Sequence, residues 1–142
     1  MMDPEDLRSF GENVDFGKTA SAYATHRAGF PTAVFEALAA RGYLHAGLRA
    51  IDLGTGAGTV SRGLAQHGLN VTGVDPASDL MSKAQTLDQA AGVKVDYVMA
   101  KAEDTQLPNR SADLITAGQC WHWCDRPAAA KEATRLLVPG GR

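Results

Sequence analysis

The sequence contains few cysteines, no concentration of charge of one sign and no long hydrophobic run. Two cysteines in 142 residues are too few for a disulfide scaffold, and 14 basic against 16 acidic side chains give a net charge of −2. Without a basic run, the electrostatic footprint of a nucleic-acid-binding protein is missing. The acidic N-terminus lacks an apolar leader segment, and no apolar run approaches the length of a membrane span. We therefore expect a cytoplasmic protein that acts on a small molecule, with no nucleic-acid or membrane partner.

The hydrophobic content is sufficient for one domain with its own core. The chain has 44% hydrophobic residues and 15 glycines, and its length leaves no room for a second domain. Residues 1–17 are polar and irregular, so we expect a loose N-terminal arm there and one domain over residues 18–142. Apolar runs of strand length alternate in that domain with helical patterns, which is typical of an α/β fold with a parallel sheet.

A glycine-rich stretch at residues 51–59 is the most informative feature of the sequence. An apolar run at residues 50–53 predicts a buried strand, and the pattern of residues 59–67 predicts a helix. Between them, Gly54 and Gly56 permit a tight turn with its backbone close to a ligand, and Gly58 opens the helix. The unpaired N–H groups at such a helix start suit an anionic or hydroxyl-rich ligand, although the same glycines would also serve a plain turn.

A second predicted strand, residues 70–74, leads into Asp75. This carboxylate follows the glycine turn by on the order of 20 residues, where a nucleoside-binding fold places the acceptor for both ribose hydroxyls. The two spaced features together favour a nucleoside ligand.

Residues 52–58, Asp-Leu-Gly-Thr-Gly-Ala-Gly, resemble motif I of the class I S-adenosylmethionine-dependent methyltransferases, which reads Asp/Glu-x-Gly-x-Gly-x-Gly. A dinucleotide-binding dehydrogenase, a weaker alternative, would place its last glycine at Thr59 and would not need Asp52. The resemblance implies S-adenosyl-L-methionine as cofactor, with Asp52 near its methionine end and Asp75 holding its ribose. It also implies a Rossmann-like, doubly wound parallel sheet with strand order 3-2-1-4-5-7-6, of which this chain encodes the first four strands and is incomplete at the C-terminus.

Three further segments resemble the methyltransferase type 11 domain of this family. Residues 23–31 are similar to its Tyr-x-x-x-Arg-Pro-x-Tyr-Pro motif, which implies that Tyr23 and Arg27 approach the cofactor's carboxylate; Arg27 as a solvated surface residue is the alternative. Residues 100–108 resemble Gly-x-Ala-Glu-x-x-x-Leu-Pro, read against the adenine edge, although Lys101 replaces the usual acceptor Asp. Residues 119–125 resemble the signature Gln-Ala-x-His-Trp-Phe-Asp.

The candidate site follows from these matches. The residues predicted to bind the cofactor are Tyr23, Arg27, Asp52, Gly54, Thr55, Gly56, Gly58, Asp75, Pro76, Met81, Ala102, Glu103 and Gln119. Met81 is implied to pack on the adenine ring, with simple core packing as the alternative. His122 is the candidate general base for a hydroxyl or amine acceptor, and a structural histidine is the alternative. No metal site is expected.

Several other elements complete the expected fold. Helices are predicted over residues 31–41, 78–91 and 126–137, and strands over residues 95–99 and 113–117. The second of these helices is expected to begin with Ser78 as its cap and to bury a stripe of four residues, namely Leu80, Ala84, Leu87 and Ala91.

The leading hypothesis is a methyltransferase domain that acts on a small-molecule acceptor, and the alternative is a cofactor-binding fragment or module without methyltransferase activity. The strand at residues 113–117 is apolar and would form an open edge. We therefore expect either self-association of the 142-residue chain through this edge or the helix after it, or a longer protein whose fifth strand begins at Arg142.

Overall fold

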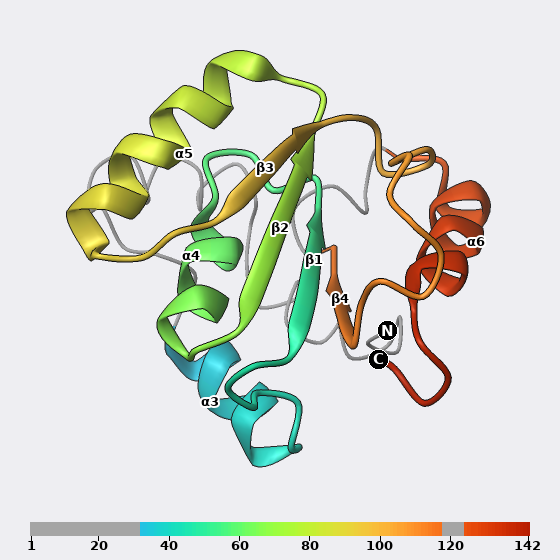
Figure 1. Cartoon of the computed structure of the whole chain (residues 1–142), viewed down its shortest axis with the longest axis horizontal. Coiled ribbons are helices and arrows are strands. Elements are labelled where there is room, and N and C mark those ends of the chain that lie inside the picture. The colour runs from blue at the N-terminus through green and yellow to red at the C-terminus, as the bar shows by residue number, and fades with distance from the viewer. Residues whose placement is uncertain (1–31, 118–123) are drawn as a thin grey trace.

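The computed structural model describes residues 32–117 and 124–142. The predicted N-terminal arm and the predicted site residues Tyr23, Arg27, Gln119 and His122 lie outside these described residues. The described part contains a parallel sheet with the strand order β3-β2-β1-β4 and helices on both faces (Figure 1). The predicted α/β class and the predicted order of the first strands are confirmed.

The elements follow the predicted alternation of strands and helices. In chain order they are α3 (Thr32–Ala40), β1 (Arg49–Leu53), α4 (Thr59–Gln66), β2 (Asn70–Asp75), α5 (Ser78–Ala91), β3 (Asp96–Met99), β4 (Leu114–Thr116) and α6 (Arg126–Leu136). Asp125 caps α6 by accepting a hydrogen bond from the Ala128 N–H. Among the described residues, none of the helices combines the length and the apolar composition needed to cross a membrane.

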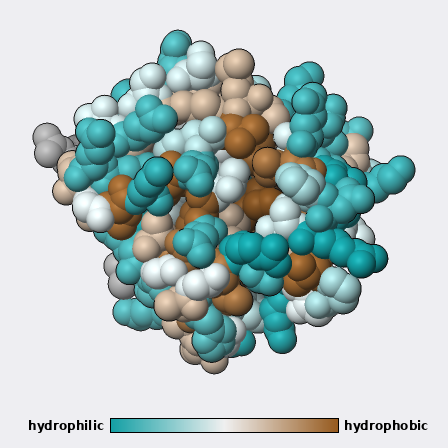
Figure 2. Space-filling view, viewed as in Figure 1, coloured by the Kyte–Doolittle hydropathy of each residue, from teal (hydrophilic) through white to brown (hydrophobic). Residues whose placement is uncertain are grey.

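Two apolar clusters fill the space between the sheet and its helices. On one face, Phe35 of α3 and Leu64 of α4 belong to a cluster with Val71 of β2. On the other face, Leu136 of α6 belongs to a cluster with Ile51 of β1. Apolar surface is also visible near the middle of the molecule in Figure 2, among hydrophilic side chains. Strands β1, β2 and β4 are thus largely buried, as expected for parallel strands, whereas β3 at the edge of the sheet is partly exposed.

The buried face of α5 differs from the predicted one. Ala84 is fully buried as predicted, but Leu87 is 42% exposed, and the charged Asp88 is buried at 3% exposure. The prediction for Leu87 was wrong because Asp88 finds polar partners on α4 and β3 that the apolar pattern does not reveal. Ser78 does not cap the helix either, since the cap position belongs to Ala77, which has no side-chain hydrogen bond to offer.

The outer edge of β4 is partly covered by the end of the chain. The Arg142 N–H donates to the Asp113 carbonyl over 2.9 Å, and the Ile115 N–H donates to the Arg142 carbonyl over 3.2 Å. These two hydrogen bonds around Leu114 form the pattern of a parallel strand pair. Arg142 therefore occupies the position predicted for the first residue of a fifth strand. Self-association through the rest of this edge stays a prediction.

Candidate functional site

The glycine turn lies at the carboxyl ends of the parallel strands, between β1 and α4 (Figure 1). Gly54, Gly56 and Gly58 have φ angles of 67°, 57° and 82°, in the left-handed region that favours glycine. The Thr55 N–H ties the turn to the neighbouring strand by donating to the Val74 carbonyl over 2.9 Å. Open parallel sheets bind ligands beyond the carboxyl ends of their strands, so the turn occupies the expected place for a ligand site.

Asp75, the last residue of β2, is bonded directly to this turn. Its Oδ2 accepts a hydrogen bond from the Gly56 N–H over 2.9 Å, and its Oδ1 accepts one from the Ala77 N–H over 2.8 Å. The side chain is 9% exposed. A carboxylate has about four acceptor positions, so these two bonds leave capacity for further donors.

Asp52, in β1, lies beneath the turn among hydroxyl groups. Thr116 Oγ1 donates to its Oδ1 over 2.7 Å, and Ser61 Oγ donates to its Oδ2 over 3.3 Å. Asp52 is 3% exposed, and this burial raises the pKa of its carboxyl to about 6, although the hydrogen bonds act in the opposite direction. The charge of Asp75 raises that pKa further. A positively charged ligand nearby would stabilise the ionised form of Asp52.

Asp52→Asn should increase the stability of the unliganded chain at pH 8 more than at pH 5. Because the folded pKa of about 6 lies above the ordinary value of 3.8, the stability contributed by protonated Asp52 is complete below pH 3.8 and is lost as pH rises through about 6. The asparagine removes the buried charge that is present at pH 8. Urea unfolding of both proteins at the two pH values measures the difference, and a variant less stable than the wild type at pH 8 would contradict it.

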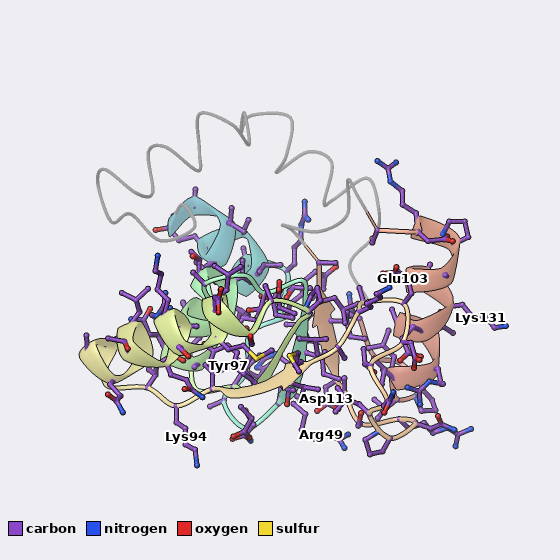
Figure 3. All side chains as sticks on the ribbon, turned by 90° about the horizontal axis from the view of Figure 1, so that it is seen from above. Arg49, Lys94, Tyr97, Glu103, Asp113 and Lys131 are labelled. Atoms are coloured by element: carbon purple, nitrogen blue, oxygen red, sulfur yellow. The ribbon has the colours of Figure 1, made fainter. Side chains whose placement is uncertain are left out.

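The loop between β3 and β4 is fixed to α6 by Glu132. Its Oε2 accepts from the backbone N–H and the hydroxyl of Thr105 over 2.8 and 2.7 Å, and Arg135 Nε donates to its Oε1 over 2.6 Å. Hydrogen bonding to Arg135 lowers the pKa of Glu132 to about 2. Within this loop Ala102 is buried, and Glu103 is half-buried on the side of the molecule that carries α6 (Figure 3). The loop that carries these two predicted residues is thus attached to α6 through Thr105.

An open groove of about 500 Å³ runs along the same loop. Neither Asp75 nor the glycine turn lines it, so the candidate site is defined by the strand ends and not by this groove. Met99 lies opposite Asp75 in the register of β2 and β3 and is 65% exposed. Half-buried Met81 lies in the first turn of α5. Together these methionines provide apolar surface near the strand ends, and Met99 was not singled out from the sequence.

The structure brings the central predicted residues together at one sheet edge, but they differ in burial and in the groups that they leave open to a ligand. The glycine turn and Asp75 are hydrogen-bonded to each other, and Asp52 lies directly before the turn. The Thr55 side chain is fully buried and shares a hydrogen bond with Ser61, and its N–H donates to the Val74 carbonyl, so Thr55 shapes the turn and has no donor left for a ligand. Pro76 is exposed beside Asp75.

The hydroxyl groups that hold Asp52 were missed by reasoning from the sequence. Ser61 and Thr116 are both buried, at 0% and 3% exposure. The signal available for Thr116 was a small polar residue inside an apolar stretch, after Leu114 and Ile115, whereas Ser61 lies between Val60 and Arg62 and carries no such signal. Such residues also occur where no ligand binds, so the pattern alone could not assign them to a site.

Comparison with known families shows which protein family the chain belongs to. The family described as "Methyltransferase domain" (Methyltransf_11) matches residues 51–142, from β1 to the end of the chain. The chain belongs to this methyltransferase family. Its members are dependent on S-adenosylmethionine, and the four-stranded sheet is part of the Rossmann-like methyltransferase fold.

Several individual methyltransferases and solved structures are also similar to this chain. An uncharacterized methyltransferase of Mycobacterium tuberculosis is 32% identical over 130 residues, which are 92% of this chain and 50% of the relative. A ubiquinone biosynthesis O-methyltransferase of Methylobacterium is 35% identical over 97 residues, 68% of this chain and 39% of the relative. A solved structure from work on the conversion of a disulfide bond into a thioacetal group during echinomycin biosynthesis is 27% identical with a TM-score of 0.67, and the match covers 75% of this chain and 45% of that one. The chain thus spans about half the length, or less, of these relatives.

Proposed function

We propose that this chain binds S-adenosyl-L-methionine and takes part in methyl transfer to a small-molecule acceptor. The observation that carries the proposal is the Asp75 carboxylate, hydrogen-bonded to the glycine turn at the carboxyl ends of the strands. The ubiquinone biosynthesis relative is an O-methyltransferase, which supports a small molecule as the acceptor. When bound, the cofactor supplies a methyl group activated by its sulfonium.

The described residues fit a positively charged nucleoside. Asp75 keeps acceptor capacity for ribose hydroxyls beyond its bonds to Gly56 and Ala77. The turn presents backbone without side chains at its glycines, so a ligand can approach closely. The buried carboxyl of Asp52 has hydroxyl groups as its hydrogen-bond partners in the described part of the chain, and a nearby cation would favour its charged form.

The remaining roles rest on the family resemblance. Tyr23, Arg27 and Gln119 would contribute further contacts to the cofactor, and His122 would remove a proton from a hydroxyl or amine acceptor. Methyl transfer from a sulfonium is an in-line displacement, so the main task of the protein is to align the two reactants and exclude water. No covalent intermediate with the protein is required.

A second candidate function is cofactor binding without catalysis. It is favoured by the placement of the described site residues, since Asp75 and the glycine turn are predicted cofactor contacts and the candidate base His122 lies outside the described residues. A radioactive methyl-transfer assay with hydroxyl and amine acceptors separates the two functions. Cofactor binding with no transfer to any acceptor would favour the second.

Asp75→Ala should weaken binding of S-adenosyl-L-methionine or its demethylated product by roughly 1.5–3 kcal/mol, the scale of hydrogen bonds to a charged group. Calorimetric titration of the 142-residue chain measures the change. Asp79→Ala is the control, because it removes the same charge from an exposed position in the first turn of α5. Equal affinity of the Asp75 variant and the wild type would remove Asp75 from the site, and stronger binding of a nicotinamide nucleotide would overturn the proposed function.

A further inference from the structure

Behind the glycine turn, three elements contribute one polar cluster, formed by Arg62 of α4, Asp88 of α5 and Tyr97 of β3. The Arg62 Nε donates to Asp88 Oδ1 over 3.0 Å, and the Tyr97 hydroxyl donates to Asp88 Oδ2 over 2.5 Å. Tyr97 lies between β3 and α5 (Figure 3). Both oxygens of Asp88 are thus engaged, each by a different element.

The cluster is removed from solvent. The side chains of Arg62 and Asp88 are 14% and 5% exposed. Burial and the neighbouring Asp88 raise the pKa of the Tyr97 hydroxyl, so this group remains a donor throughout the range in which the chain would be studied. A buried ion pair is weak evidence for stability, because apolar residues of similar volume often stabilise a fold as well or better. The effect of this cluster on the geometry of its neighbours is therefore a better guide to its role than its contribution to stability.

The cluster contacts the glycine turn at two points. The Arg62 Nη2 donates to the carbonyl of Ala57, the residue between Gly56 and Gly58, over 2.7 Å. A Cβ atom added at Gly58 would lie 2.4 Å from the Tyr97 hydroxyl oxygen, 3.1 Å from the Ala84 Cβ and 3.3 Å from the Arg62 Nη2. The cluster thus fills the space behind Gly58 and holds the peptide unit that joins Ala57 to it.

The geometry points to Arg62, Asp88 and Tyr97 as positioning residues that set the conformation of the glycine turn and, through it, the affinity for the cofactor. This inference rests on the proposed function for its second part. Asp88 acts only through Arg62, which touches the turn, and Tyr97 acts by orienting Asp88 and by bounding Gly58. None of the three is assigned a contact with the cofactor.

Calorimetric titration with S-adenosylhomocysteine tests the effect on affinity in the 142-residue chain. Tyr97→Phe and Asp88→Asn should each weaken binding by about tenfold, the scale of one charge-assisted hydrogen bond. Val71→Ala is the control, since it removes buried volume from the same face of the sheet without touching the turn. It should lower the thermal midpoint and leave the dissociation constant unchanged.

A rescue experiment distinguishes positioning from general destabilisation. Gly58→Ala should weaken binding because its methyl group meets the Tyr97 hydroxyl and because alanine is strained at a φ of 82°, and only the first of these effects depends on Tyr97. Removing that hydroxyl leaves no atom closer than 3.1 Å to the added Cβ. Tyr97→Phe should therefore strengthen binding in the Gly58→Ala background, although it weakens binding in the wild-type background. Weakening in both backgrounds, or unchanged affinity of both single cluster variants, would overturn the inference.

Amide NMR spectra of the unliganded chain keep the two proposals apart. The Gly56 and Gly58 amide resonances should shift in Tyr97→Phe and Asp88→Asn and stay in place in Val71→Ala. If the wild type does not bind S-adenosylhomocysteine, the proposed function fails and the claim about affinity fails with it. If the turn amides do not respond to the cluster variants, the positioning role fails even where the wild type binds.

Discussion

Gly56→Val should abolish detectable cofactor binding while the chain remains folded. Gly56 has a φ of 57°, a conformation that a β-branched residue resists. A shift of this φ would displace the Gly56 N–H, which donates to Asp75 Oδ2 over 2.9 Å, and the isopropyl group would occupy space where the backbone approaches the ligand. The first effect disturbs the hydrogen bond between Gly56 and Asp75, and the second blocks the ligand directly. We therefore expect the dissociation constant to rise by roughly 100-fold or more.

Gly92→Val is a matched control for this experiment. Gly92 has a φ of 74°, no atom lies within 4 Å of a Cβ added there, and the residue ends α5 far along the chain from the turn. The two variants therefore introduce similar backbone strain, but only one of them affects the turn. Circular dichroism verifies that both are folded, and calorimetry measures binding. Equal affinity in Gly56→Val and Gly92→Val would show that the turn has no ligand role.

The arrangement of the strand ends could be predicted because it depends on local features of the sequence. Each predicted strand is a short, mainly apolar run, and the first two are followed by residue types with a narrow structural meaning, the glycines after β1 and Asp75 at the end of β2. The parallel connection rule then places these carboxyl ends at one edge. The hydrogen bond between Asp75 and Gly56 is a consequence of that juxtaposition.

The burial of Asp88 could not be predicted in the same way. Apolar periodicity favours Leu87 as the inward residue, because it considers one helix without its neighbours. In the structure, Asp88 is buried since Arg62 and Tyr97 both hydrogen-bond to it, and these partners are 26 and 9 residues away in the sequence. A buried charge requires such partners, and no local pattern shows that they are present.

The roles predicted for His122 and Gln119 rest on sequence resemblance alone. His122 and Gln119 match the family signature, but they lie outside the described residues. Among the described residues, β4 ends at Thr116, which hydrogen-bonds to Asp52, and α6 begins at Arg126. The carboxyl end of β4 therefore lies at the same edge of the sheet as the glycine turn.

Glu132→Gln should lower the free energy of unfolding at pH 7 by roughly 2–3 kcal/mol. The pKa of Glu132 falls from 4.5 to about 2, and each pKa unit corresponds to about 1.4 kcal/mol; because Arg135 is 35% exposed, we reduce the full value for solvent screening. The amide nitrogen of glutamine cannot accept hydrogen bonds, so one of the bonds from Thr105 or Arg135 is lost. The loop that carries Ala102 and Glu103 then loses part of its attachment to α6.

The dependence on pH identifies the cause of that destabilisation. The folded pKa of Glu132 lies below its ordinary value, so its stabilising contribution is complete above pH 4.5 and is lost as pH falls through about 2. The difference between wild type and Glu132→Gln, measured by urea unfolding, should be constant from pH 8 to 6 and shrink toward pH 3. Asp113→Asn serves as the control, because Asp113 pairs with Arg49 where the two side chains are 26% and 50% exposed (Figure 3), and pairs of this kind contribute about 1 kcal/mol or less. Equal losses in the two variants, or a Glu132→Gln difference that persists undiminished at pH 3, would show that the loop is held by packing and not by this carboxylate.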